Sequence, residues 1–110
     1  MEEFVKGDVV VFPYPFSDFS SQKRRPAIVV AIPQGKDIIA CQITSQAHFD
    51  NYSINLDDND FASGTLNLRS YIRPNKLISI DKNIIIYKAG TVHQSKLDEV
   101  IKSIISILLN

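Results

Sequence analysis

The spacing of apolar residues changes once along this chain, near its C-terminal end, and this change constrains the fold most strongly. A set of apolar residues there recurs at the three- and four-residue spacing of one helical face: Leu97, Val100, Ile101, Ile104, Ile105 and Leu108. The spacing predicts a helix of about fourteen residues. Ser95 followed by Asp98 resembles a capping box at its start. We expect this helix to pack on a sheet built from the preceding residues.

The preceding residues form short apolar runs separated by single Pro, Gly, Asn and Ser residues, which is typical of strands and turns. The runs predict strands over residues 7–12, 26–32, 37–44, 52–56, 70–73, 77–80 and 84–87. Pro13 and Pro15 lack an amide donor, so the first strand should end early or lie at a sheet edge. We expect Gly90 to end the last strand, a turn at residues 34–36, and loops over 17–25 and 57–64. The pattern predicts a mainly β fold with a C-terminal helix, as a small, strongly bent antiparallel sheet or barrel.

Length and charge narrow the class of protein. A chain of 110 residues predicts one domain, residues 1–110, and 45% hydrophobic residues suffice for its core. Twelve Lys plus Arg balance twelve Asp plus Glu, which excludes a uniformly basic surface but leaves room for a local basic patch. The single Cys41 excludes an internal disulfide, and we find neither a membrane-spanning run nor a secretory signal. We therefore expect a soluble, cytoplasmic domain with no membrane partner.

Motifs for common cofactor and metal chemistry are absent. The glycines are isolated, so no Gly-rich phosphate loop exists, and no His-Glu-x-x-His, Cys-x-x-Cys or Gly-x-Ser-x-Gly motif occurs. The acidic stretch from Asp57 to Asp60 fails the spacing of a calcium loop, because Leu68 stands where a bidentate Glu is needed. His48 and His93 leave open a two-histidine acid–base pair. We expect no metal site and no cofactor.

Basic residues gather in two short stretches that are candidates for binding nucleic acid. The stretches contain Lys23, Arg24 and Arg25, and then Arg69, Arg73 and Lys76. Guanidinium groups bind phosphate through two parallel hydrogen bonds, so a fold that joins the stretches would form a cationic groove. Tyr14, Phe16 and Phe19 border the first stretch and are candidates to stack on unpaired bases. The alternative is that these are solvated loop charges and core aromatics.

Five segments follow one another along the chain: residues 7–11 (GDVVV), 23–30 (KRRPAIVV), 43–45 (ITS), 70–82 (SYIRPNKLISIDK) and the final turn and predicted helix of 90–109. In this order they resemble the MazF/PemK toxin family. The resemblance implies the SH3-like small barrel of MazF/PemK/CcdB-like proteins. It also implies a homodimeric, metal-independent endoribonuclease, a toxin of the bacterial cytoplasm that is neutralised by a cognate antitoxin. Such an enzyme would cut single-stranded RNA at short sequences and leave 2′,3′-cyclic phosphate and 5′-hydroxyl ends.

The resemblance also implies which residues act. Arg25 matches the arginine of the family's Arg-Pro motif, Thr44 its strand-end threonine, and Arg73 the arginine of an Arg-x-Asp motif. Asn75 replaces the aspartate of that motif and Ile78 replaces a common arginine. We expect Arg25, Thr44 and Arg73 to be catalytic, with Arg25 as a charge clamp. The expected RNA-binding residues are Lys23, Arg24, Ser45, Arg69, Ser70, Asn75, Lys76, Phe16 and Phe19.

Alternatives remain at each of these positions. Water, Arg73 or His48 are candidates for the general base. Arg25 could instead form a surface ion pair with Asp18 or Asp8, and Thr44 could be an ordinary strand residue. For the whole chain, the alternatives are a non-catalytic module of the same fold that binds RNA or a protein target such as gyrase, and an interaction domain with no nucleic-acid role.

Overall fold

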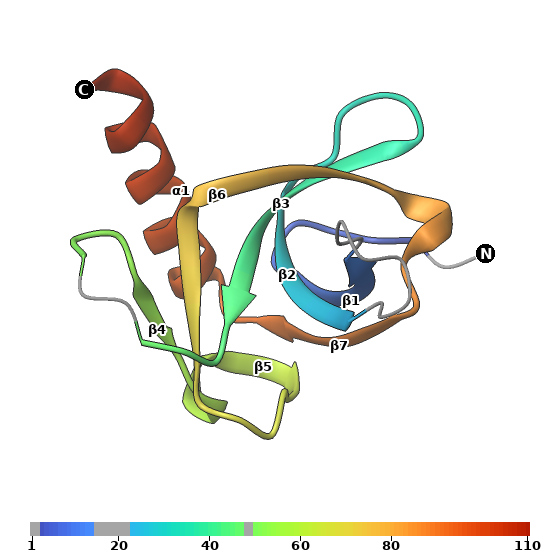
Figure 1. Ribbon diagram of the computed structural model, residues 1–110, viewed down its shortest axis with the longest axis horizontal. Helices are drawn as coiled ribbons and strands as arrows, with labels where there is room; N and C mark the ends of the chain where they lie inside the picture. The colour runs from blue at the N-terminus through green and yellow to red at the C-terminus, as the bar shows by residue number, and fades with distance from the viewer. Residues whose placement is uncertain (1–2, 15–22, 48–49) are drawn as a thin grey trace.

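Most residues that the computed structural model describes, which are 3–14, 23–47 and 50–110, belong to one antiparallel sheet and one helix (Figure 1). Seven strands lie in the order β4-β6-β3-β2-β1-β7-β5 within this part of the chain. The strands are β1 (Asp8–Tyr14), β2 (Lys23–Ala31), β3 (Asp37–Thr44), β4 (Ile54–Leu56), β5 (Phe61–Gly64), β6 (Ser70–Asp81) and β7 (Tyr87–Val92). The helix is α1 (Gln94–Leu109), and short 3₁₀ turns span Asp58–Asp60 and Lys82–Ile84. The prediction of a mainly β fold with a C-terminal helix is confirmed.

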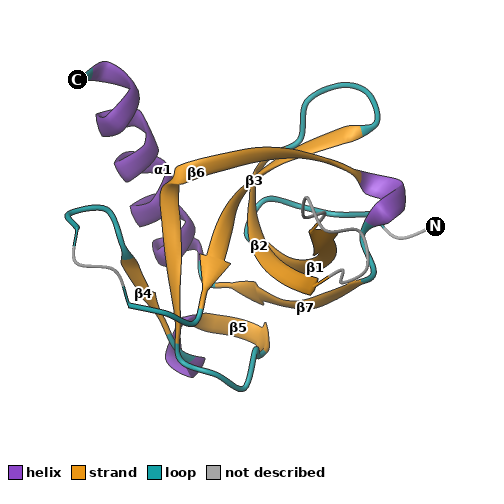
Figure 2. Cartoon of the chain, viewed as in Figure 1, coloured by secondary structure: helices purple, strands orange, loops and turns teal. Residues whose placement is uncertain are grey.

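The sheet is strongly curved, and α1 lies at one side of it, beside β6 (Figure 2). Neighbouring residues of a strand point to opposite faces, so the two faces bury different residues. Val9 and Ile28 belong to one hydrophobic cluster, which includes residues of α1. Val10 and Val29 belong to a second cluster. Because both faces of β1 and β2 are covered, these strands are continuous apolar runs rather than alternating ones.

The long strand β6 contains a bulge where the sequence predicted a break. Across the β3–β6 pair, Cys41 is opposite Leu77, whereas the next residue, Gln42, is opposite Arg73. Residues 74–76 therefore have no counterpart on β3. The predicted strands 70–73 and 77–80 are one strand that bends, because Pro74 interrupts the ladder without ending it. Figure 1 shows β6 crossing the molecule and turning sharply near α1.

The position of β1 differs from the prediction. We expected an early end or an edge position, but β1 lies between β2 and β7 and continues through Pro13 to Tyr14. β7 pairs only with residues 8–11 of β1, whereas Pro13 is opposite Arg24 of β2. Pro13 is tolerated because it lies beyond the part of β1 that β7 pairs with, so its missing donor costs no bond to β7. Pro15 lies outside the described residues.

Two predicted loops contain strand residues. Lys23, Arg24 and Arg25 lie in β2 opposite the end of β1, not in a loop. Residues 61–64 form β5, which pairs with β7, whereas we expected a loop through residue 64. Residues 23–25 are basic, and residues 61–64 are a short run with Gly and Ser, so only pairing with a partner strand identifies them as strands.

Gly90 does not end a strand but lies within β7, which begins at Tyr87 rather than at Ile84. Gly90 is opposite Gly64 of β5. A Cβ at Gly90 would lie 2.4 Å from the backbone oxygen of Ser63. A glycine is therefore required here by the close approach of β5 to β7.

The helix α1 buries Leu97, Val100 and Ile104, as its period predicted, but Ile105 and Leu108 are 49% and 69% exposed. The predicted capping box is wrong. His93 is the N-cap, and it makes no side-chain capping bond. Because the helix begins at Gln94, Ser95 already lies inside the first turn, and Asp98 instead accepts a hydrogen bond from the Gln94 Nε2 at 2.9 Å. In the described part of the chain, no helix is long and apolar enough to cross a membrane.

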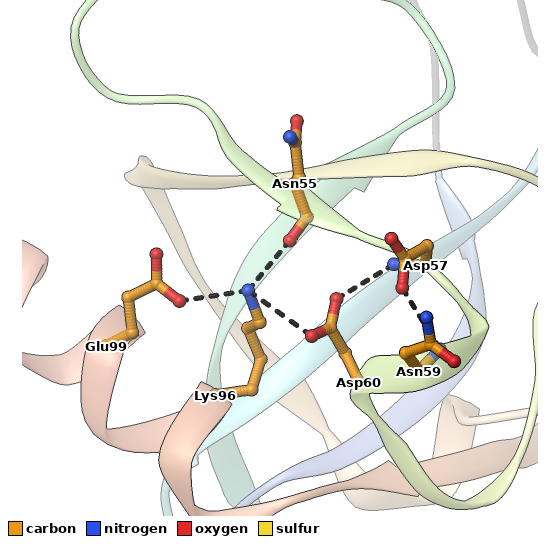
Figure 3. A network of polar contacts seen from close by, with 6 residues as sticks. All are labelled: Asn55, Asp57, Asn59, Asp60, Lys96 and Glu99. Atoms are coloured by element: carbon orange, nitrogen blue, oxygen red, sulfur yellow. Dashed lines mark hydrogen bonds and ion pairs between the residues drawn. The ribbon is translucent and has the colours of Figure 1, made fainter.

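Lys96 of α1 joins the helix to the β4–β5 connection (Figure 3). Its ammonium donates to the backbone oxygen of Asn55 at 3.0 Å and to Glu99 at 2.9 Å, and lies 3.6 Å from Asp60. Asp60 in turn accepts from the backbone amide of Asp57, as half of a capping box that orders the 3₁₀ turn. This network fixes the turn before β5 against the start of the helix.

Candidate active site

A cavity of about 360 Å³ opens where β2 begins and β3 ends. The two strands are antiparallel neighbours, with Ala27 opposite Gln42, so the start of one lies beside the end of the other. The residues that line the cavity come from both strands and from the chain before β6: Lys23, Arg24, Arg25, Pro26, Ile43, Thr44, Ser45, Gln46, Leu66, Leu68 and Ser70. We call it the first cavity. It combines three basic side chains with hydroxyl and amide groups.

A second cavity of about 190 Å³ adjoins the first. Its lining residues are Arg25, Gln42, Ile43, Thr44, Gln46, Arg73 and Lys76. Arg25 and Thr44 line both cavities. The structure therefore places them at one junction, with Lys23 and Arg24 on one side and Arg73 and Lys76 on the other.

Arg25 is half-buried, and an aromatic ring contacts its guanidinium. The guanidinium carbon lies 5.3 Å from the centre of the Tyr14 ring. Tyr14 is held edge-to-face against Phe12, with ring centres 6.2 Å apart. The face of an aromatic ring attracts a cation, so Tyr14 orients Arg25 beside the cavities. The sequence makes Tyr14 a candidate to stack on unpaired bases, and in the structure its ring lies against the Arg25 guanidinium.

Thr44 is the last residue of β3, and its hydroxyl accepts a hydrogen bond from the backbone amide of Gln46 at 3.2 Å. A hydroxyl that accepts this bond keeps its own proton for another partner. The turn directly after β3 therefore orients the hydroxyl at the junction of the cavities.

Arg73 is almost fully buried, with 8% of its side chain exposed. Its Nη1 lies 2.8 Å from Oδ2 of Asp50 and donates to the hydroxyl of Ser53 at 3.0 Å. Asp50 also accepts from the backbone amides of Tyr52 and Ser53. The bond from Tyr52 foremost, and the contact with Arg73, hold the pKa of the Asp50 carboxyl below its ordinary value. The carboxylate that faces Arg73 is therefore ionised.

Other predicted site residues lie elsewhere. Arg69 lines a separate cavity of about 220 Å³ together with Asp57 and Asp58. Asn75 is exposed in the β6 bulge and is not among the residues that line the first and second cavities. His93 is the N-cap of α1. Four residues that the sequence singled out lie outside the described residues: Phe16, Asp18, Phe19 and His48.

Asp8, the other partner considered for Arg25, is a structural anchor instead. It is fully buried, and its carboxylate accepts from the backbone amide of Val5 at 2.9 Å and from the Thr91 hydroxyl at 2.8 Å. These bonds join the residues before β1 to β7. In the described part of the chain, no three His, Cys, Asp or Glu side chains are grouped to hold a metal ion.

Sequence reasoning missed four polar residues of the site. Gln42 lies two residues before Thr44 on β3, so the period of two could have identified it as a residue of the same strand face. Gln46 lines the cavity from the turn after β3. Asp50 and Ser53 contact Arg73 from twenty residues or more away in sequence, and no sequence motif links them to it.

Comparison with known proteins identifies the family. The profile of the PemK-like, MazF-like toxins of type II toxin–antitoxin systems matches residues 5–108. The chain therefore belongs to this family, as the resemblance implied. No curated protein matches the chain.

Solved structures share the fold at low sequence identity. An endoribonuclease from a mycobacterial species, in complex with its cognate antitoxin, aligns with a TM-score of 0.74 and 14% identity over 96% of this chain and 95% of that chain. The MazE–MazF complex from Deinococcus radiodurans aligns with a TM-score of 0.71 and 18% identity, covering 94% of each chain. These likenesses confirm the predicted small MazF-like barrel.

Proposed function

We propose that this chain is an endoribonuclease toxin that cuts single-stranded RNA within the two adjoining cavities. One observation carries the proposal, namely that Arg25 and Thr44 line both cavities, with further basic residues on either side. The family to which the chain belongs and the endoribonucleases that share its fold support the same activity.

The arrangement suits an RNA backbone although the chain has no net charge. Lys23 and Arg24 in the first cavity and Arg73 and Lys76 in the second give cations on both sides of the junction. Phosphates on either side of the cut would contact these groups, while the reacting phosphate lies at Arg25. A local concentration of positive charge attracts a polyanion even when the whole protein is neutral.

The chemistry uses a nucleophile that RNA itself carries. The 2′-oxygen gives up its proton to a base and bonds to the adjacent phosphorus, and the bond from phosphorus to the 5′-oxygen breaks. The leaving 5′-oxygen takes up a proton, so a 2′,3′-cyclic phosphate and a 5′-hydroxyl remain. An arginine stays protonated at neutral pH, so Arg25 stabilises the extra negative charge of the transition state rather than accepting a proton. The Thr44 hydroxyl donates to a phosphate oxygen. DNA lacks the 2′-hydroxyl and cannot react by this route.

The partners follow from the same surface. We expect a cognate antitoxin with an acidic segment that occupies the cationic cavities and competes with RNA. We also expect a homodimer, in which a symmetric interface would bring two copies of the site into one particle, and action in the bacterial cytoplasm.

The decisive experiment is incubation of the purified chain with single-stranded RNA in excess EDTA, with analysis of the product ends. We expect cleavage to 2′,3′-cyclic phosphate and 5′-hydroxyl ends, and no cleavage of DNA of the same sequence. Arg25→Ala should lower the rate by roughly 10²–10³-fold, and Thr44→Val should lower it as well. Lys102→Ala removes an exposed charge on α1 and serves as the matched control.

Intact RNA under every condition would contradict this proposal. RNA that is bound but not cut would favour the non-catalytic alternative, a module that binds RNA. A chain that neither cuts nor binds RNA would direct the search to a protein target such as gyrase.

A further inference from the structure

The second cavity contains a buried arginine whose counterion lies on a different part of the chain. Arg73 is on β6, and Asp50 is in the connection between β3 and β4. Burying a guanidinium without an opposite charge is costly, so the ion pair at 2.8 Å is what makes this position tolerable for Arg73. Asn75, two residues along β6, is exposed and carries no charge to replace Asp50.

The nitrogen atoms of the Arg73 guanidinium differ in their partners. Nη1 bonds to both Asp50 and Ser53, whereas Nε is buried without a hydrogen-bond partner in the described part of the chain. A buried donor without a partner is costly unless a ligand satisfies it. Arg73 also lines the second cavity beside Arg25 and Thr44. Because Nη1 is already paired with Asp50 and Ser53, the remaining N–H groups of the guanidinium are available to bind an anion in that cavity.

Asp50 itself is held in place by the backbone. It accepts from the amides of Tyr52 and Ser53 at 2.9 and 3.2 Å. The backbone of the turn that contains Asp50 thus orients this carboxylate independently of Arg73. A fixed carboxylate can fix the rotamer of the arginine that it binds.

We propose that Asp50 is the positioning residue for Arg73: it balances the buried charge and orients the guanidinium so that its remaining donors bind an RNA phosphate in the second cavity. This inference rests on the proposed ribonuclease function. Ser53 assists through a neutral hydrogen bond to the same nitrogen. Asp50 does not line the cavity and acts only through Arg73.

The test compares Asp50→Asn, Asp50→Glu and Ser53→Ala, with Asp98→Asn on α1 as the control that removes the same charge elsewhere. We expect Asp50→Asn to lower kcat/KM for RNA cleavage by roughly 10- to 100-fold, because the phosphate clamp is displaced. Asp50→Glu should recover part of the loss, Ser53→Ala should cost less, and Asp98→Asn should match the wild type. Circular dichroism melting curves check that each variant is folded.

A double-mutant cycle separates positioning from a merely structural role. In an Arg73→Ala background, Asp50→Asn should cause no further loss of activity, since Asp50 acts only through Arg73. A full additional loss in that background would overturn the inference. The inference would also be overturned if Asp50→Asn cleaved RNA at the wild-type rate or faster while Arg73→Ala was impaired. Neither result would contradict the proposed ribonuclease function.

A binding readout keeps the inference testable without cleavage. The Nε–H resonance of Arg73 is followed by NMR while 2′-O-methyl RNA, which lacks the reacting hydroxyl, is added. We expect a distinct resonance that shifts in the wild type and broadens in folded Asp50→Asn. A resonance that does not respond to RNA in the wild type would overturn the inference, whereas absence of cleavage with a normal NMR response would overturn only the enzymatic proposal.

Discussion

The guanidinium of Arg25 lies over the ring of Tyr14, 5.3 Å from its centre, and the two residues come from paired strands. We expect Tyr14→Phe to retain nearly full cleavage, because the ring face remains. Tyr14→Leu removes a contact of about 0.5–1 kcal/mol, which corresponds to a roughly two- to fivefold slower rate if the contact orients Arg25 in the transition state. Single-turnover rates measure both effects, and equal rates for the two variants would show that the ring has no part in orienting Arg25.

Lys76 and Arg69 provide a contrast in RNA binding. Lys76 lines the second cavity, whereas Arg69 lines a separate cavity that also contains two acidic residues, Asp57 and Asp58. Lys76→Ala should reduce the slope of log affinity against log salt by about 0.7, the value for one contact with a single-stranded phosphate. Arg69→Ala should change it less. Titration of 2′-O-methyl RNA at several salt concentrations measures both slopes. A larger change for Arg69→Ala than for Lys76→Ala would indicate that RNA binds along the separate cavity instead.

Gly90→Ala should destabilise the fold. The new Cβ would lie 2.4 Å from the Ser63 oxygen, so β5 and β7 must separate. We expect a loss of about 1–3 kcal/mol in the free energy of unfolding, as for other overpacked sites. Ser63→Ala keeps that backbone oxygen and should change stability by less than about 0.5 kcal/mol. Urea denaturation measures both, and an unchanged midpoint for Gly90→Ala would show that the strands adjust freely.

Lys96 should contribute more to stability than its partner Glu99. The Lys96 side chain is mostly buried and bonds to the backbone of Asn55, whereas Glu99 is exposed. Lys96→Met keeps the aliphatic stem but removes the hydrogen bond to the Asn55 oxygen and the charge beside Asp60, which should cost about 0.5–1.5 kcal/mol. Glu99→Gln should cost less than about 1 kcal/mol. Thermal melts in low and high salt distinguish them, and equal losses would argue against the Lys96–Asn55 hydrogen bond as the main contribution.

Cys41 should make the stability depend on alkaline pH. Burial raises the pKa of its thiol from 9.0 to about 12. Between these values the unfolded chain has lost the thiol proton while the folded chain retains it. The stabilising difference is therefore present below pH 9 and declines as the pH rises toward 12, by at most about 1.4 kcal/mol per pH unit. Unfolding of the wild type and of Cys41→Ala from pH 8 to 11 isolates this slope, and parallel curves would contradict it.

Local sequence patterns correctly predicted the helix and the strands whose conformation is determined by residues close together in the sequence. The helix follows from the three- and four-residue spacing of Leu97, Val100 and Ile104, because their burial on one face requires a helix. The strand over residues 37–44 was predicted with the bounds it has in the structure. The order of short motifs also indicated the family, which the match over residues 5–108 confirms.

Errors occurred where a partner strand decides the conformation. The bulge at residues 74–76 depends on the register of β6 against β3. The need for glycine at position 90 depends on how closely β5 approaches β7. Residues 61–64 form a strand because β7 pairs with them. None of these relationships is present in the local sequence.

For the site, the chain alone determined which side chains are suited to bind phosphate: its arginines, lysines and hydroxyl groups. The tertiary structure decided which of them meet. It places Arg25 and Thr44 at one junction, sets Arg69 apart, and pairs Arg73 with Asp50 from another segment. The physical reason is that distances between remote residues follow from strand order and register, which arise from the burial of both sheet faces together rather than from any single segment.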